Sequence, residues 1–139
     1  MSVVNAHRLL AACIALAAPC TYAADIAYPA RPIRFIIPQS PGGASDTVGR
    51  IVAQKLSDNF GQQLVVYNRP GATGNIGHEM AAKATPDGYT LLMTAPNLVT
   101  STSLYARVPF DPVRDFTPVT HLTLSPNVWI VHPSFAPKT

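Results

Sequence analysis

Two short loops in the sequence carry residue types that could bind a small anion. They are residues 39–43 (QSPGG) and residues 70–74 (PGATG), and each is followed by a segment with helical periodicity. Glycine allows a ligand to approach the backbone closely. The first turn of a helix presents unpaired N–H groups and a partial positive charge. The two loops are therefore candidate binding segments for a carboxylate.

The candidate substrate-binding residues lie in these two loops, directly after them, or in a third loop at residues 95–97. The loops also offer hydroxyl groups as hydrogen-bond donors. An alternative interpretation remains open, in which the glycines only shape the turns and the acidic residue only caps its helix. The candidates are Ser40, Gly42, Gly43, Ala44, Asp46, Ala72, Thr73, Gly74, Asn75 and Asn97.

The second loop also matches a cofactor-binding pattern. Residues 71–77 (GATGNIG) have the glycine spacing of short-chain dehydrogenases, which bind nicotinamide cofactors. That fingerprint should directly follow the first strand, and the next strand should end in an acidic residue for the ribose. Here the pattern follows the second expected strand after Arg69 and Pro70, and residues 94–97 contain no acid. We therefore expect no cofactor.

The histidines and serines lack the spacing of catalytic or metal sites. His78 and the glutamate after it are not followed by the second histidine of HExxH, and no serine lies in GxSxG. We expect the histidines at the surface or at strand ends, and Trp129 and the tyrosines in the core. The sequence thus predicts no metal and no enzyme, with an exported α/β enzyme as the alternative class.

The elements that must position the loops alternate between strand and helix. This order is typical of βαβ units on a mainly parallel sheet, an α/β fold, and the carboxyl ends of parallel strands form the ligand-binding edge of such sheets. Both loops should therefore meet at one edge. Apolar runs predict strands at residues 33–37, 63–68, 90–94 and 128–131, and periodicity predicts helices at residues 44–59 and 75–84.

The composition excludes several classes of protein. Of the 139 residues, 47% are hydrophobic, only 12% are charged and 14 are prolines. A disordered polar chain needs more charge, and a coiled coil tolerates few prolines. The formal net charge is +3 without a cluster of basic residues, so we expect no nucleic-acid partner.

The first residues have the layout of a secretory signal peptide. Residues 1–23 contain a basic start, an apolar run at residues 9–18, and small residues before a cleavage point after Ala23. The apolar run is too short to span a membrane. We expect a periplasmic protein that loses Cys13 and Cys20 with the signal, without a lipid anchor at Cys13.

Taken together, the motifs resemble the solute-binding receptors of tripartite tricarboxylate transporters, also called Bug receptors. The resemblance covers nearly all of residues 25–139, and the order of the motifs makes it specific. They are YPxRPI at 28–33, PGGASD at 41–46, NRPGATGNIG at 68–77, AxPDGYTLL at 84–92, PFDP at 109–112, RDFxPV at 114–119 and VHP at 131–133.

The resemblance implies a lobe like that of type II periplasmic binding proteins. Such a receptor is a two-lobed monomer that closes on a small organic carboxylate of the di- or tricarboxylate class and delivers it to membrane permease subunits. The PGGASD and GATGN segments would bind the carboxylate through N–H groups, hydroxyls and bridging water. Members of the family are longer, so we expect residues 24–139 to be an incomplete lobe 1 that ends near the crossover to lobe 2 and binds weakly alone.

Overall fold

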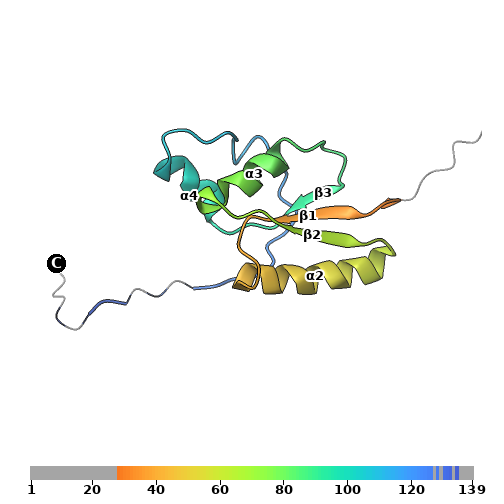
Figure 1. Ribbon diagram of the computed structural model, residues 1–139, viewed down its shortest axis with the longest axis horizontal. Helices are drawn as coiled ribbons and strands as arrows, with labels where there is room; N and C mark the ends of the chain where they lie inside the picture. The colour runs from red at the N-terminus through yellow and green to blue at the C-terminus, as the bar shows by residue number, and fades with distance from the viewer. Residues whose placement is uncertain (1–27, 127, 129, 133, 135–139) are drawn as a thin grey trace, which may run out of the picture.

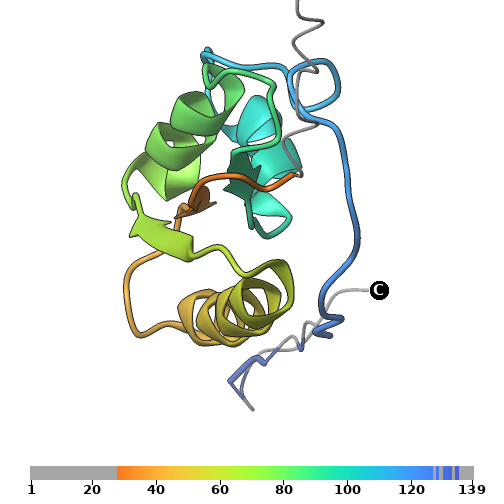
Figure 2. The same cartoon turned by 90° about the vertical axis from the view of Figure 1, so that its right-hand side faces the viewer.

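A computed structural model describes residues 28–126, 128, 130–132 and 134. The expected signal peptide at residues 1–23, with its cysteines, lies outside the described residues. Within the described part, a three-stranded parallel sheet carries a long helix on one face and two short helices on the other (Figures 1 and 2). No helix in that part is long and apolar enough to cross a membrane.

The sheet has the strand order β2-β1-β3, so the first strand lies in the centre. Ile33 pairs with Leu64 at the start of β1 and β2, and Arg34 pairs with Thr90 of β3. All pairs are parallel, which confirms the α/β fold and the mainly parallel sheet predicted from the sequence. The strands are β1 (Ile33–Ile37), β2 (Leu64–Asn68) and β3 (Thr90–Leu92).

The helices begin directly after the glycine-bearing loops, as predicted, with one addition. The helix α2 ends at Gly61, whose φ of 63° lies in the left-handed region and whose N–H donates to Ser57 O. An unpredicted helix follows β3, in a segment rich in hydroxyl and β-branched residues with low helix propensity. The helices are α2 (Ala44–Phe60), the 3₁₀ turn η1 (Ala72–Gly74), α3 (Asn75–Ala82) and α4 (Asn97–Leu104).

The core lies between α2 and the sheet. Its fully packed members are Ile33, Phe35, Ala53 and Leu64. Gly49 lets α2 approach the sheet, because a Cβ there would collide with Ile37 Cδ1 and lie 3.1 Å from Met93 Sδ. The helix and strands that carry the two loops are therefore held together by close packing.

Two expectations differ from the structure. Val128, Ile130 and Val131 are exposed and belong to no strand, while Trp129 lies outside the described residues. A strand needs a hydrogen-bonded neighbour, and the described residues provide none there. Tyr28, Tyr67 and Tyr105 are exposed and do not fill the core, whereas Tyr89 is half-buried and packs against it.

Candidate functional site

The two candidate loops lie side by side at the carboxyl edge of the sheet. They follow β1 and β2, which are parallel neighbours. A Cβ placed on Gly74 would lie 3.1 Å from Pro38 Cβ, and one on Gly77 would lie 2.9 Å from the same atom. Only glycine at these positions allows the second loop and α3 to rest directly on the start of the first loop.

The first loop is organised around the buried carboxylate of Asp46. It accepts hydrogen bonds from Gly42 N–H at 2.9 Å, Arg50 Nε at 3.0 Å and Asn68 Nδ2 at 2.9 Å. The bond from Arg50, followed by those from Gly42 and Asn68, lowers the pKa of Asp46 to about 2. Asp46 therefore stays ionised and holds the loop to α2 and β2, and its oxygens already have partners within the chain.

The second loop has a backbone of unusual conformation. Gly71 and Gly74 have φ values of 125° and 95°, and the two residues between them, Ala72 and Thr73, have φ values of 47° and 58°. Left-handed backbone is rare for a β-branched residue such as threonine. Strained residues of this kind persist only where the surroundings hold them, and they cluster at functional sites.

Thr73 is held by two side chains from α4. Asn97 Nδ2 donates to Thr73 O at 2.5 Å, and the hydroxyls of Thr73 and Tyr105 are 2.7 Å apart. Asn97 is the first residue of α4, and Tyr105 is its C-cap. Asn97 was predicted to belong to the site, whereas Tyr105 was not, because nothing local in the sequence links it to a residue 32 positions earlier.

Several of the predicted backbone donors are already engaged within the loops. Gly74 N–H donates to Gly71 O at 2.9 Å, Asn75 N–H donates to Ala72 O, and Gly43 N–H makes a long 3.4 Å bond to Ser40 O. The N-cap residue of α2, Gly43, offers no side-chain acceptor to the helix. The N–H groups of the first turn, beginning with Ala44, have no acceptor within the helix.

The predicted residues thus divide by exposure. Asp46, Gly74 and Asn75 are buried, and Asn97 is half-buried. Asn75 is only 7% exposed, and its Oδ1 has no hydrogen-bond partner in the described part of the chain. The others lie at the surface of the same sheet edge, and they are Ser40, Gly42, Gly43, Ala44, Ala72 and Thr73.

His78 lies behind the second loop, in contrast to the expected surface position. It is fully buried, its Nε2 lies 2.7 Å from Thr94 Oγ1, and its ring meets Phe110 edge-on at 5.3 Å. Burial lowers the pKa of His78 below its usual value, so the ring is neutral at pH 7. The described residues contain no group of three histidine, cysteine or acidic side chains that could hold a metal.

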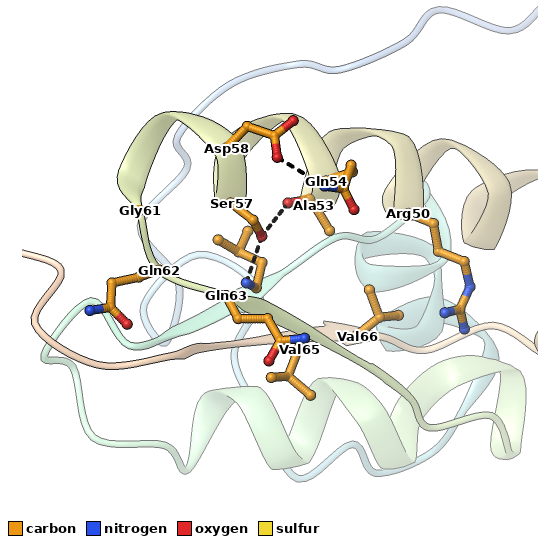
Figure 3. A pocket seen from close by; sticks show the side chains of 11 residues that line it. Arg50, Ala53, Gln54, Ser57, Asp58, Gly61, Gln62, Gln63, Val65 and Val66 are labelled. Carbon is orange, nitrogen blue, oxygen red and sulfur yellow. Dashed lines mark hydrogen bonds between the residues drawn. The ribbon is translucent and has the colours of Figure 1, made fainter.

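Two hollows on the described surface lie away from the loops. One, of about 750 Å³, runs between α2 and β2 and is lined by residues such as Gln54, Ser57 and Gln62 (Figure 3). The other, of about 460 Å³, lies near the start of the strands beside Arg34 and Tyr89. Neither is lined by a predicted site residue.

The dehydrogenase alternative does not fit this arrangement. The pattern at residues 71–77 follows β2, which is an edge strand, and it leads into a 3₁₀ turn before α3. The dinucleotide fingerprint instead joins the first strand of the fold directly to its helix.

Comparison with known proteins gives a consistent family. Residues 48–139 match the model of the tripartite tricarboxylate transporter family receptor. Protein BugT of Bordetella pertussis is 40% identical over 134 residues, which are 93% of this chain and 41% of BugT. A UPF0065 protein in the tcbD-tcbE intergenic region of Pseudomonas sp. strain P51 is 45% identical over 105 residues, 76% of this chain and 31% of that protein. The chain thus spans about a third to two fifths of the length of these curated relatives.

Solved structures show the same likeness. The periplasmic binding protein BugD aligns with a TM-score of 0.63 and 37% identity, covering 66% of this chain and 30% of BugD. Rpa4515 of R. palustris with adipate aligns with a TM-score of 0.64 and 38% identity, covering 66% of this chain and 31% of Rpa4515. MatC (Rpa3494) from Rhodopseudomonas palustris with bound malate aligns with a TM-score of 0.61 and 30% identity, covering 68% of this chain and 33% of MatC.

These findings confirm the resemblance drawn from the motifs and the fold of a periplasmic-binding-protein lobe. The family is one of receptors and not of enzymes. On the matched residues and on the shared fold, the chain belongs to the receptor family of the tripartite tricarboxylate transporters.

Proposed function

We propose that this chain forms the carboxylate-binding part of an extracytoplasmic receptor for a tripartite tricarboxylate transporter. The observation that carries the proposal is the pair of helix-opening loops, which lie side by side at one sheet edge before α2 and α3. Both helices have a glycine N-cap without a side-chain hydrogen bond. At the start of α3, Asn75 N–H already donates to Ala72 O, so the positive end that we assign to an external anion is that of α2.

The chemistry of the ligand is a small organic carboxylate of the di- or tricarboxylate class. Two relatives in the family were solved with adipate and with malate, which are both dicarboxylates. In this chain, the N–H groups that begin with Ala44 are the first donors we assign to a ligand carboxylate. The second group of donors that we assign consists of the Ser40 hydroxyl and the side-chain amide of Asn75, which belong to the loops at the same sheet edge.

Asp46 takes a different role in this proposal. Its carboxylate already accepts three hydrogen bonds, so it fixes the first loop and does not bind the ligand. A ligand anion at the start of α2 is tolerated because Arg50 balances the charge of Asp46. The receptor uses the dipole and first-turn N–H groups of a helix rather than a free arginine.

Membership of the family supports a proposal for the location and partners. We infer a periplasmic protein that is exported through residues 1–23, works as a monomer and hands its ligand to membrane permease subunits. Residues 24–139 would form part of lobe 1, with a second lobe closing on the ligand. If a two-lobed receptor binds at about micromolar concentration, a lobe that keeps about half of that free energy binds at about millimolar.

A nuclear magnetic resonance titration of the ¹⁵N-labelled protein tests the site. Adipate should give saturable shifts of the Ala44 and Ser45 amides, while Gln62, in the hollow of Figure 3, should not respond. The neutral diamide adipamide, which has the same length, is the control and should leave all three amides unchanged. Equal responses to both compounds, or no response of the first-turn amides to adipate, would overturn the proposal.

A further inference from the structure

The strained conformation of the second loop needs a partner to maintain it. Thr73 has a φ of 58° and Ala72 a φ of 47°, although neither is glycine. A free loop with these residues would relax to more populated backbone conformations. The first turn of α3, which follows this loop, would then no longer be held at the sheet edge.

The partner is α4, which binds Thr73 through both of its ends. Asn97 at the start of α4 donates to the carbonyl of Thr73, and Tyr105 at its end bonds the hydroxyl of the same residue. One bond holds the backbone and the other holds the side chain. Together they restrain both the position and the rotation of Thr73, and we refer to Thr73, Asn97 and Tyr105 as the Thr73 clamp.

The clamp is anchored to the buried part of the protein. A Cβ on Gly74 would lie 2.7 Å from Asn97 Nδ2, so the Asn97 side chain rests directly on the loop backbone. The preceding segment is fixed by the 2.7 Å contact between Thr94 and the buried His78. Ser101, in the middle of α4, is fully buried. These contacts attach α4 to the body of the protein.

We propose that Tyr105 is a positioning residue of the carboxylate site, which acts by holding Thr73 in its left-handed conformation. This inference rests on the proposed function, since the loop that Tyr105 holds is one of the two assigned to the ligand. Tyr105 contacts the loop through its hydroxyl, so its effect on binding is transmitted through Thr73. A preformed loop binds more tightly because no ordering is needed when the ligand arrives.

The central variant is Tyr105→Phe, which removes only the hydroxyl. Tyr28→Phe is the matched control, because Tyr28 is also exposed and its hydroxyl donates to Gly88 O at 2.7 Å, at the opposite end of the sheet. Loss of one hydrogen bond that holds the loop should raise the Kd for adipate about five-fold in Tyr105→Phe. Tyr28→Phe should leave the Kd unchanged.

A second pair of variants separates positioning from general damage. Thr73→Ser keeps the hydroxyl, so adding Tyr105→Phe to this variant should still raise the Kd for adipate. Thr73→Gly removes the hydroxyl and accepts a left-handed φ without strain. In the Thr73→Gly background, Tyr105→Phe should therefore have no further effect on the Kd. An equal effect of Tyr105→Phe in both backgrounds would overturn the clamp.

Hydrogen exchange keeps this inference separate from the proposed function. Exchange of the Gly74 amide, which donates to Gly71 O at 2.9 Å, should be faster in Tyr105→Phe than in the original protein or in Tyr28→Phe, with or without ligand. If the original protein does not bind adipate but exchange rises, the proposed function fails and the clamp stands. If adipate binds but neither exchange nor Kd changes in Tyr105→Phe, the clamp fails alone.

Discussion

Replacing Gly74 with alanine should damage the candidate site, because this glycine has a positive φ and close neighbours on several sides. Gly74 has a φ of 95°, which L-residues rarely adopt. The new Cβ would also lie 2.7 Å from Asn97 Nδ2, 3.1 Å from Pro38 Cβ and 3.2 Å from His78 Cε1. The substitution therefore combines backbone strain with crowding against three neighbours.

The magnitude follows from adding these two effects. A left-handed backbone costs an L-residue about 1–2 kcal/mol. Overpacking of a close contact costs about 1–3 kcal/mol more. Gly74→Ala should thus lower the free energy of unfolding by about 2–5 kcal/mol, a large part of the stability of a typical domain. Relief of the crowding would push Asn97 away and weaken its bond to Thr73.

Gly42→Ala is the matched control for the backbone effect. Gly42 also has a positive φ, of 80°, but a Cβ there would have no atom within 4 Å. It should lower the free energy of unfolding by only about 1–2 kcal/mol. Urea unfolding followed by circular dichroism measures both values. Equal losses of unfolding free energy in the two variants would refute the crowding at Gly74. No loss in either variant would also refute the positive φ assigned to both glycines.

Three further predictions test the supports of the site. The pKa of Asp46 is lowered to about 2 from a usual value of 3.8, so the stability that its ionised form contributes is complete above pH 3.8 and is lost as the pH falls through 2. Thermal unfolding should show this loss, and the Asp46→Asn variant should lack this part of the pH dependence. Burial lowers the pKa of His78 below 6.5. As the pH falls below 6.5, the unfolded chain therefore binds a proton at this histidine more readily than the folded protein does, and the folded protein loses stability. Melting temperatures between pH 7 and 5 should therefore drop less in His78→Gln than in the original protein, and an equal drop would contradict the assignment. Ser57 Oγ donates to Ala53 O at 2.7 Å and accepts from Leu64 N–H at 2.8 Å (Figure 3), so Ser57→Ala should cost about 1–2 kcal/mol in urea unfolding, whereas Thr102→Ala, on the exposed side of α4, should cost less.

The regular elements that carry the site were predictable because their signals are local. The apolar run at 33–37 became β1, with Ile33, Ile36 and Ile37 fully buried. Helical spacing after the first loop became α2, and Gly61 ended it in the left-handed conformation. The acid in the first turn and the arginine four residues later lie on the same helix face and form a pair, with Arg50 Nε 3.0 Å from Asp46. These features depend on neighbours within a few residues.

The parts that were missed depend on contacts between distant segments. The bond between Thr73 and Tyr105 joins residues 32 positions apart, and the burial of His78 requires Phe110 from a later segment. The helix α4 forms from a sequence of weak helix formers because it packs on η1 and α3. Val128, Ile130 and Val131 show the opposite case, since their β-propensity is not matched by a strand in the described part of the chain, which offers them no strand to pair with.

The distribution of hydrogen bonds also changes where a carboxylate would be bound. The sequence favoured the loop glycines as donors, but Gly42 N–H is occupied by Asp46 and Gly74 N–H by Gly71 O. These bonds shape the loops, and for this reason the proposed donors are the N–H groups of the first turn of α2. Since Asp46 is ionised at neutral pH, a ligand anion there adds a second negative charge beside it. The Arg50 guanidinium, 54% exposed and 3.0 Å from Asp46, offsets the first charge. In the proposed site, this pairing reduces the repulsion between Asp46 and a ligand anion at the start of α2, without requiring that Arg50 contact the ligand.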